Sequence, residues 1–157
     1  MGLGAHAKVT MPEQTSETVL ALDVGEARIG LAQWDAARGV RDAGVIRRAS
    51  RADDLQRLVG IVAERGVTRI VVGLPRNLDG SEGPQARLSR RFAGALGRAV
   101  AAPVELFDEY ETTREATAEL GLGGRPLDAR ERGRVDSRSA TILLRRYLDA
   151  RAPGIRE

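Results

Sequence analysis

The chain has 157 residues, enough for one domain with a sizeable core, and its formal net charge at pH 7 is only +3. It contains no cysteine, which excludes a disulfide framework, a thiol nucleophile and a Cys-based zinc site. The single histidine, His6, lies near the N-terminus, which excludes mechanisms built on a histidine base. No apolar run approaches the roughly 20 residues of a membrane span, and no signal peptide is predicted. We therefore expect a cytoplasmic protein without membrane contact.

Almost all of the positive charge is arginine, because Lys8 is the only lysine. The planar guanidinium group is suited to phosphate. However, arginine can also accumulate through genome composition, together with the abundant Ala and Gly. Only the placement of particular arginines can therefore argue for nucleic acid.

Residues 1–17 have no periodic apolar pattern, and we predict a poorly ordered extension or leader there, with a short tail over residues 152–157. Residues 18–151 are predicted to form one domain. Alternating apolar residues predict strands over residues 19–23, 28–34 and 40–47, and the short connections between them predict an antiparallel meander. A helix is expected from an N-cap at Ser50 to a stop at Gly66.

The second half of the chain alternates strands and helices. A continuous apolar run over residues 69–73 predicts a strand buried on both faces, and Pro84 opens a helix after a loop of turn formers. Further elements are expected at 103–108 (strand), 112–120 (helix), 121–133 (mobile surface loop) and 135–151 (helix). The order βββαβαβαα predicts an α/β, ribonuclease-H-like fold. Its five-stranded mixed sheet would have three antiparallel strands followed by βα crossovers, flanked by helices.

Three carboxylates lie where predicted elements begin or end: Asp23, Glu109 and Asp136. Asp23 closes the first strand and Glu109 follows the fifth. Asp136 shares a helix face with the apolar residues at 140, 143 and 147. Carboxylates that meet at the end of a sheet need a countercharge, which a hard divalent cation supplies. The pattern therefore indicates two-metal phosphodiester chemistry.

Each carboxylate also has an ordinary interpretation. Asp23 could be a solvated residue of a hairpin, Asp108 could exchange roles with Glu109, and Asp136 could simply be the N-cap of its helix.

Two segments are candidates for phosphate binding. In the Asp23-Val24-Gly25 turn, Gly25 could take a positive φ and let a phosphate or metal approach the backbone. In the loop before Pro84, three side chains could donate to phosphate oxygens, namely Arg76, Asn77 and Ser81. The same loop residues could equally be turn formers.

Four motifs together resemble the YqgF family, also called RuvX, of Holliday junction resolvases and ribosomal RNA precursor nucleases. They are Asp23-Val24-Gly25 with Arg28-Ile29-Gly30, the loop from Val72 to Gly83, Asp108-Glu109 with Thr112-Thr113, and the last helix from Val135 to Asp149. The resemblance implies an endonuclease with Mg²⁺ or Mn²⁺ in a two-metal site held by Asp23, Glu109 and Asp136. Tyr110 stands where the family usually has Arg, so Arg114 or Arg76 would have to replace that residue.

The resulting hypothesis is an endonuclease acting on structured nucleic acid, with branched DNA and Holliday junction resolution favoured. The predicted substrate contacts are Gly25, Arg28, Arg76, Asn77, Ser81, Thr112, Thr113 and Arg114. A resolvase must cut two strands symmetrically, which predicts a homodimer. The main alternative is maturation of the small-subunit ribosomal RNA precursor. A catalytically silent RNA- or ribosome-binding module and an actin-like ATP-binding fold are weaker alternatives.

Overall fold

The computed structural model describes residues 16–109, 112–124 and 126–151, with the side chains of residues 112–115 left aside. Its strands are β1 (Thr18–Val24), β2 (Arg28–Asp35), β3 (Gly39–Arg47), β4 (Arg69–Pro75) and β5 (Val104–Glu109). Its helices are α1 (Arg51–Arg65), α2 (Pro84–Ala99), α3 (Thr112–Glu119) and α4 (Ala129–Arg151). The predicted extension over residues 1–15, the tail over 152–157, Tyr110 and Glu111 lie outside the described residues.

The five strands form one mixed sheet in the order β3-β2-β1-β4-β5. β1 pairs antiparallel with β2, and β2 with β3, while β4 runs parallel to both β1 and β5. This confirms the predicted meander followed by crossovers, with β1 at the centre. The carboxyl ends of β1, β4 and β5 consequently lie at the same end of the sheet.

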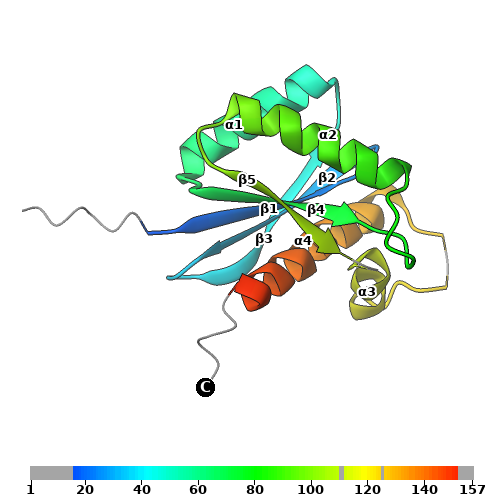
Figure 1. Cartoon of the computed structure of the whole chain (residues 1–157). Helices are drawn as coiled ribbons and strands as arrows, with labels where there is room; N and C mark the ends of the chain where they lie inside the picture. The colour runs from blue at the N-terminus through cyan, green and yellow to red at the C-terminus, as the bar shows by residue number, and fades with distance from the viewer. Residues whose placement is uncertain (1–15, 110–111, 125, 152–157) are drawn as a thin grey trace, which may run out of the picture.

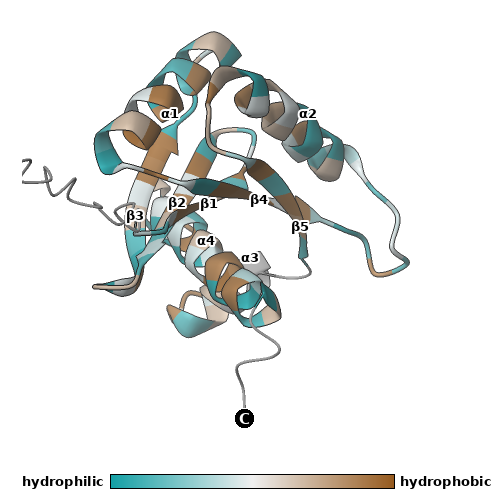
Figure 2. Cartoon of the chain, turned by 60° about the vertical axis from the view of Figure 1, so that its left-hand side comes forward, coloured by the Kyte–Doolittle hydropathy of each residue, from teal (hydrophilic) through white to brown (hydrophobic). Residues whose placement is uncertain are grey.

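Helices cover both faces of the sheet. α1 and α2 lie on one face, and α4 crosses the other with α3 beside it (Figure 1). The signals predicted for α1 are present: the Ser50 hydroxyl accepts from the Asp53 amide at 3.0 Å, and Gly66 ends the helix with φ of 62°. Figure 2 shows the central strands, largely brown, between helices whose outward sides carry many teal residues. None of the helices in the described ranges combines the length and apolarity needed to span a membrane.

The period of two along each strand divides the core into two parts. On β1, Leu20 and Leu22 pack under α1 and α2, whereas Val19 and Ala21 pack under α4. Asp23 continues the second series and therefore lies on the α4 face. The same alternation places Gly73 of β4 and Glu109 of β5 on that face.

The start of α4 differs from the prediction. The helix begins at Ala129, so the predicted loop over residues 121–133 extended too far and the predicted helix start at Val135 was wrong. The Asp128 carboxylate accepts from the Glu131 amide at 2.8 Å, as an N-cap does. Asp128 followed three residues later by Glu131 matches a capping signature. Asp136 therefore lies inside the helix, and its interpretation as a cap was also wrong.

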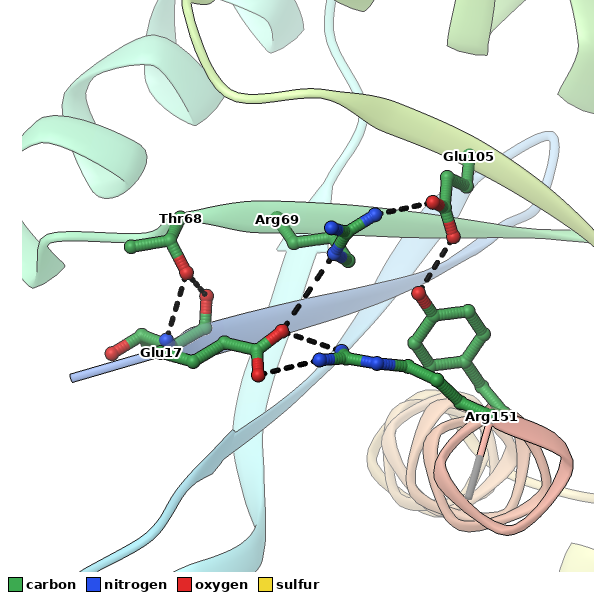
Figure 3. Close-up of polar contacts among 7 residues, drawn as sticks. Glu17, Thr68, Arg69, Glu105 and Arg151 are labelled. Atoms are coloured by element: carbon green, nitrogen blue, oxygen red, sulfur yellow. Dashed lines mark hydrogen bonds and ion pairs between the residues drawn. The ribbon is translucent and has the colours of Figure 1, made fainter. Parts of the chain in front are cut away.

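Glu17 was wrongly assigned to the N-terminal extension. Its carboxylate pairs with the Arg151 guanidinium at 2.5 Å and lies 3.7 Å from Nε of Arg69 (Figure 3). Arg69 also pairs with Glu105, which accepts from the Tyr147 hydroxyl at 2.6 Å. The Arg151 hydrogen bond lowers the pKa of Glu17. This network joins the start of β1, β4 and β5 to the last turns of α4, at the end of the sheet opposite Asp23.

The first half of α4 lies directly against the backbone of β2. A Cβ atom on Gly30 would be 2.0 Å from the Asp136 carbonyl oxygen and 2.4 Å from its carbonyl carbon. Both are backbone atoms, which cannot rotate away as a side chain can. Gly30 is therefore required for α4 to dock where it does.

Replacing Gly30 with alanine should lower the free energy of unfolding by about 1–3 kcal/mol, because the new methyl group forces α4 away from β2. Gly60→Ala is the matched control. Gly60 lies within α1, has no atom within 4 Å of its would-be Cβ and does not have a positive φ. Alanine there should stabilise the protein by up to about 1 kcal/mol. Urea denaturation of both variants tests the pair, and a Gly30→Ala protein as stable as the parent would contradict this description of α4.

Candidate metal and nucleic-acid site

The three predicted carboxylates lie on the same face of the sheet and near the same end. Asp23 and Glu109 occupy the carboxyl ends of β1 and β5, and Asp136 projects from α4, which packs across that face. Gly30 is the register partner of Asp23 on β2, and the backbone of Asp136 rests on this glycine. Three segments distant in the sequence are thus brought together by strand register and helix docking.

The structure distinguishes Glu109 from its neighbour. Glu109 is 4% exposed and lies over Gly73, where a Cβ atom would be 2.5 Å from Oε1 of Glu109. Asp108 points to the opposite face, and its exposed carboxylate pairs with Nε of Arg76 at 2.8 Å. Glu109 is therefore the member of the pair that joins Asp23, and Gly73 provides the space for its carboxylate.

The charges of these carboxylates are not fully balanced. Burial raises the pKa of Asp23 well above its usual value, and the negative charges of Glu109 and Asp136 raise it further. Burial also raises the pKa of Asp136, although the hydrogen bond and charge of Arg28 oppose this change. A bound cation would relieve the repulsion that Asp23 experiences.

Arg28, which was predicted to contact substrate, pairs with Asp136 in the structure. Its Nε donates to Oδ2 of Asp136 at 2.5 Å, so the guanidinium group supplies part of the missing positive charge. The donor set suits a hard divalent cation, since all three side chains offer carboxylate oxygens. In the described part of the chain, however, no three carboxylate or histidine side chains converge on a single metal position. To complete a set of three metal ligands, the Asp136 carboxylate would have to release Arg28 and bind the cation instead.

The turn after Asp23 is supported by Arg48 and Asp54, two residues that the sequence analysis missed. Gly25 does not have a positive φ, contrary to the expectation; a Cβ there would be 2.9 Å from the Arg28 carbonyl oxygen, so close approach is what requires glycine. Arg48 donates to the Gly25 carbonyl at 3.0 Å and pairs with Asp54 at 3.0 Å. Asp54 is fully buried. Its place four residues before Leu58, on the apolar face of α1, was the available signal.

The loop between β4 and α2 forms hydrogen bonds mainly with itself. Nη1 of Arg76 donates to the Gly80 carbonyl, and Nδ2 of Asn77 donates to the Ser81 hydroxyl, each at 3.0 Å. The Ser81 hydroxyl in turn donates to Asp79 at 2.6 Å. These groups therefore shape the loop, and any substrate contact would be added to these bonds. The backbone of Thr112, Thr113 and Arg114 begins α3, shortly after Glu109.

Comparison with known proteins gives consistent matches. Residues 17–150 match the RuvX family, described as Holliday junction resolvase. A relative from Anaeromyxobacter sp. (strain K), named "Putative pre-16S rRNA nuclease", is 47% identical over 136 residues, which cover 85% of this chain and 98% of that protein. A relative of the same name from Chloroflexus aurantiacus is 44% identical over 137 residues, or 86% of this chain and 88% of that protein.

The fold also has solved counterparts. RuvC of Thermus thermophilus, in complex with a Holliday junction substrate, superimposes with a TM-score of 0.54 at 11% sequence identity. The match covers 87% of this chain and 97% of RuvC. The likeness confirms the ribonuclease-H-like fold predicted from the order of elements. By its sequence and its sheet, the chain belongs to the RuvX (YqgF) family of nucleases.

Proposed function

We propose that this chain is a divalent-metal-dependent endonuclease that acts in the cytoplasm to trim the precursor of small-subunit ribosomal RNA. The observation that carries the chemistry is the placement of Asp23, Glu109 and Asp136 on one face, with the pKa of Asp23 raised in part by its two neighbours. The substrate is taken from the names of relatives at 44% and 47% identity. These names favour ribosomal RNA over the branched DNA that the motifs alone suggested.

Each residue has a distinct part in the proposed reaction. Asp23, Glu109 and Asp136 would hold two ions of Mg²⁺ or Mn²⁺, with Asp23, on the central strand, contributing to both. When bound, such ions activate water and stabilise the leaving oxygen of a phosphodiester. Arg28 holds the Asp136 carboxylate until a cation replaces it, and Arg48 fixes the turn that follows Asp23. Glu109 itself is buried, so bulk water has little access to its carboxylate.

Holliday junction resolution is the second candidate, supported by the description of the family. It makes a different demand on assembly, because two symmetric cuts need two sites and hence a homodimer. Trimming a precursor RNA needs one site. Tight binding without cleavage under any divalent metal would instead favour a silent RNA- or ribosome-binding module.

The two substrates can be compared directly. We expect the full-length protein to cut a 16S precursor RNA at defined positions with Mg²⁺ or Mn²⁺, and to leave a mobile four-way DNA junction intact or to nick it slowly. Gel analysis of both labelled substrates at equal concentration is the measurement. Paired, symmetric nicks in the junction, with two protomers bound by light scattering, would reverse the order of the two candidates.

Asp23→Asn tests the carboxylates independently of substrate. The variant should lose cleavage, and in EDTA it should be at least as stable as the parent, because a repelled negative charge has been removed. Mg²⁺ or Mn²⁺ should raise the Tm of the parent but not of the variant, since binding to the native state stabilises it.

The stability difference in EDTA should also depend on pH. Because the folded-state pKa of Asp23 is raised above 3.8, the parent loses stability as pH rises from 3.8 through that raised pKa. Below pH 3.8 the parent and the variant should differ little in their free energy of unfolding. Equal metal-induced shifts in Tm for both proteins would remove Asp23 from the metal site.

A further inference from the structure

The outward face of α2 differs in charge from the rest of its helix layer. α2 contains Arg87, Arg90, Arg91 and Arg98 and no acidic residue. The neighbouring helix α1 packs on the same face of the sheet, and its three arginines are accompanied by the outward acidic residues Asp53 and Glu64. A genome-wide drift toward arginine would affect both helices alike. The unbalanced charge on α2 is therefore a local feature.

Three of these arginines form a line along the helix. Arg87, Arg91 and Arg98 are all exposed, and spacings of four and seven residues place them on one side of an α-helix. We call these three residues the α2 arginine stripe. The buried residues of α2, such as Phe92 and Leu96, lie on the opposite side. From Arg87 to Arg98 is 11 residue steps, so the stripe is about 16 Å long. This is the length of about five nucleotides of one strand in a B-form duplex.

Two members of the stripe have no acidic partner. Within the described ranges, Arg91 and Arg98 form no ion pair, whereas Arg90, just beside the stripe, pairs with Glu82. Arg87 donates to the Glu82 carbonyl at 3.3 Å. The guanidinium groups of these two exposed residues are therefore available to an anion, and phosphate is an anion that guanidinium groups bind in bidentate geometry.

The first turn of α2 lies at the same end of the sheet as the carboxylates, although on the opposite face. Nε2 of Gln85, in this turn, donates to the carbonyl of Val24 at 2.5 Å. Val24 directly follows Asp23, so a strand that passes from the carboxylates around this end of the sheet would reach Arg87 first and then Arg91. The loop that precedes α2 lies at the same end of the molecule (Figure 1).

Gly94 provides a separate observation. It lies between Arg91 and Arg98 on the same side of the helix, and it is exposed. A Cβ there would meet only Nη1 of Arg98, at 3.7 Å, which is ordinary contact. Gly60 of α1 is open in the same way, so this glycine does not by itself indicate a ligand. It does leave the surface between Arg91 and Arg98 free of a side chain, so that a phosphate backbone could approach the helix closely.

We propose that the α2 arginine stripe binds the phosphate backbone of the nucleic-acid substrate on one flank of the cleavage site. The inference rests on the proposed function in taking nucleic acid as the substrate. It adds a binding surface outside the carboxylate site and a direction for the bound strand, from Asp23 along the outer side of α2.

Binding can be tested without cleavage in the Asp23→Asn background. The probe is a fluorescein-labelled RNA that contains the 16S precursor cleavage site with long flanks on both sides, together with versions lacking one flank or the other. Adding Arg91→Ala and Arg98→Ala should raise Kd several-fold. It should also reduce the slope of log K against log salt by about 1.4–1.8, the loss of two phosphate contacts. Arg91→Lys with Arg98→Lys should retain most of the slope.

The matched control is Arg38→Ala with Arg145→Ala in the same background. These two arginines are exposed, lie off α2 and give the same change in net charge. This variant should bind like the Asp23→Asn parent. Removing one particular flank of the RNA should abolish the difference between the stripe variant and the parent, because the lost contacts are to that flank.

Three results would overturn the proposal. The salt slope could be unchanged in the stripe variant, or the control variant could lose as much affinity as the stripe variant. The third is a loss of affinity that persists whichever flank of the RNA is removed. The measurement is separate from the proposed function. Failure of the wild-type protein to cut RNA would reject the proposed substrate while leaving the salt slopes as evidence for or against the stripe.

Discussion

The direct contact between α4 and the backbone of β2 is the constraint on which the site depends. Asp136 comes from a helix far along the chain, and it reaches Asp23 only because Gly30 lets the two backbones touch. Gly73 has a similar role under Glu109. Two glycines thus provide the space that lets three carboxylates lie on one face and near one end of the sheet. The arrangement of the site depends on residues that carry no functional group of their own.

Bringing carboxylates together has an electrostatic cost, and the chain offsets part of it with arginine. Arg28 binds Asp136 directly, while Arg48 and the fully buried Asp54 support the turn after Asp23 from the other face of the sheet. The Arg48–Asp54 pair is internally neutral, which reduces the cost of burying Asp54. One arginine therefore offsets part of the charge of the site, and the other supports its backbone.

The sequence predicted the fold well because its signals are local. Alternation, caps and the short connections of the meander are all encoded within a few residues, so the strands and α1 were placed within a residue or two. The start of α4 was misplaced because residues 121–133, rich in Gly, Arg and Pro, have the composition of a loop, although Asp128 caps a helix there. Tertiary packing overrides such propensities.

The site was predicted only in part, for a related reason. Residue type and position at element ends identified Asp23, Glu109 and Asp136, and strand alternation could have separated Glu109 from Asp108. The partners of Arg28 and Arg76 could not be predicted, because they depend on contacts across 108 and 32 residues of sequence. Long-range pairing of charged side chains leaves no periodic trace in a single sequence.

The ion pair between Glu17 and Arg151 has a consequence for how the domain can be connected to other segments. It places the first and last residues of the folded region next to each other, at the end of the sheet far from Asp23. Fusion partners, affinity tags or an immobilising surface joined directly at Glu17 or Arg151 would thus be attached at the end of the sheet opposite the carboxylates. The adjacent ends also make the fold suited to circular permutation, with a short linker joining them.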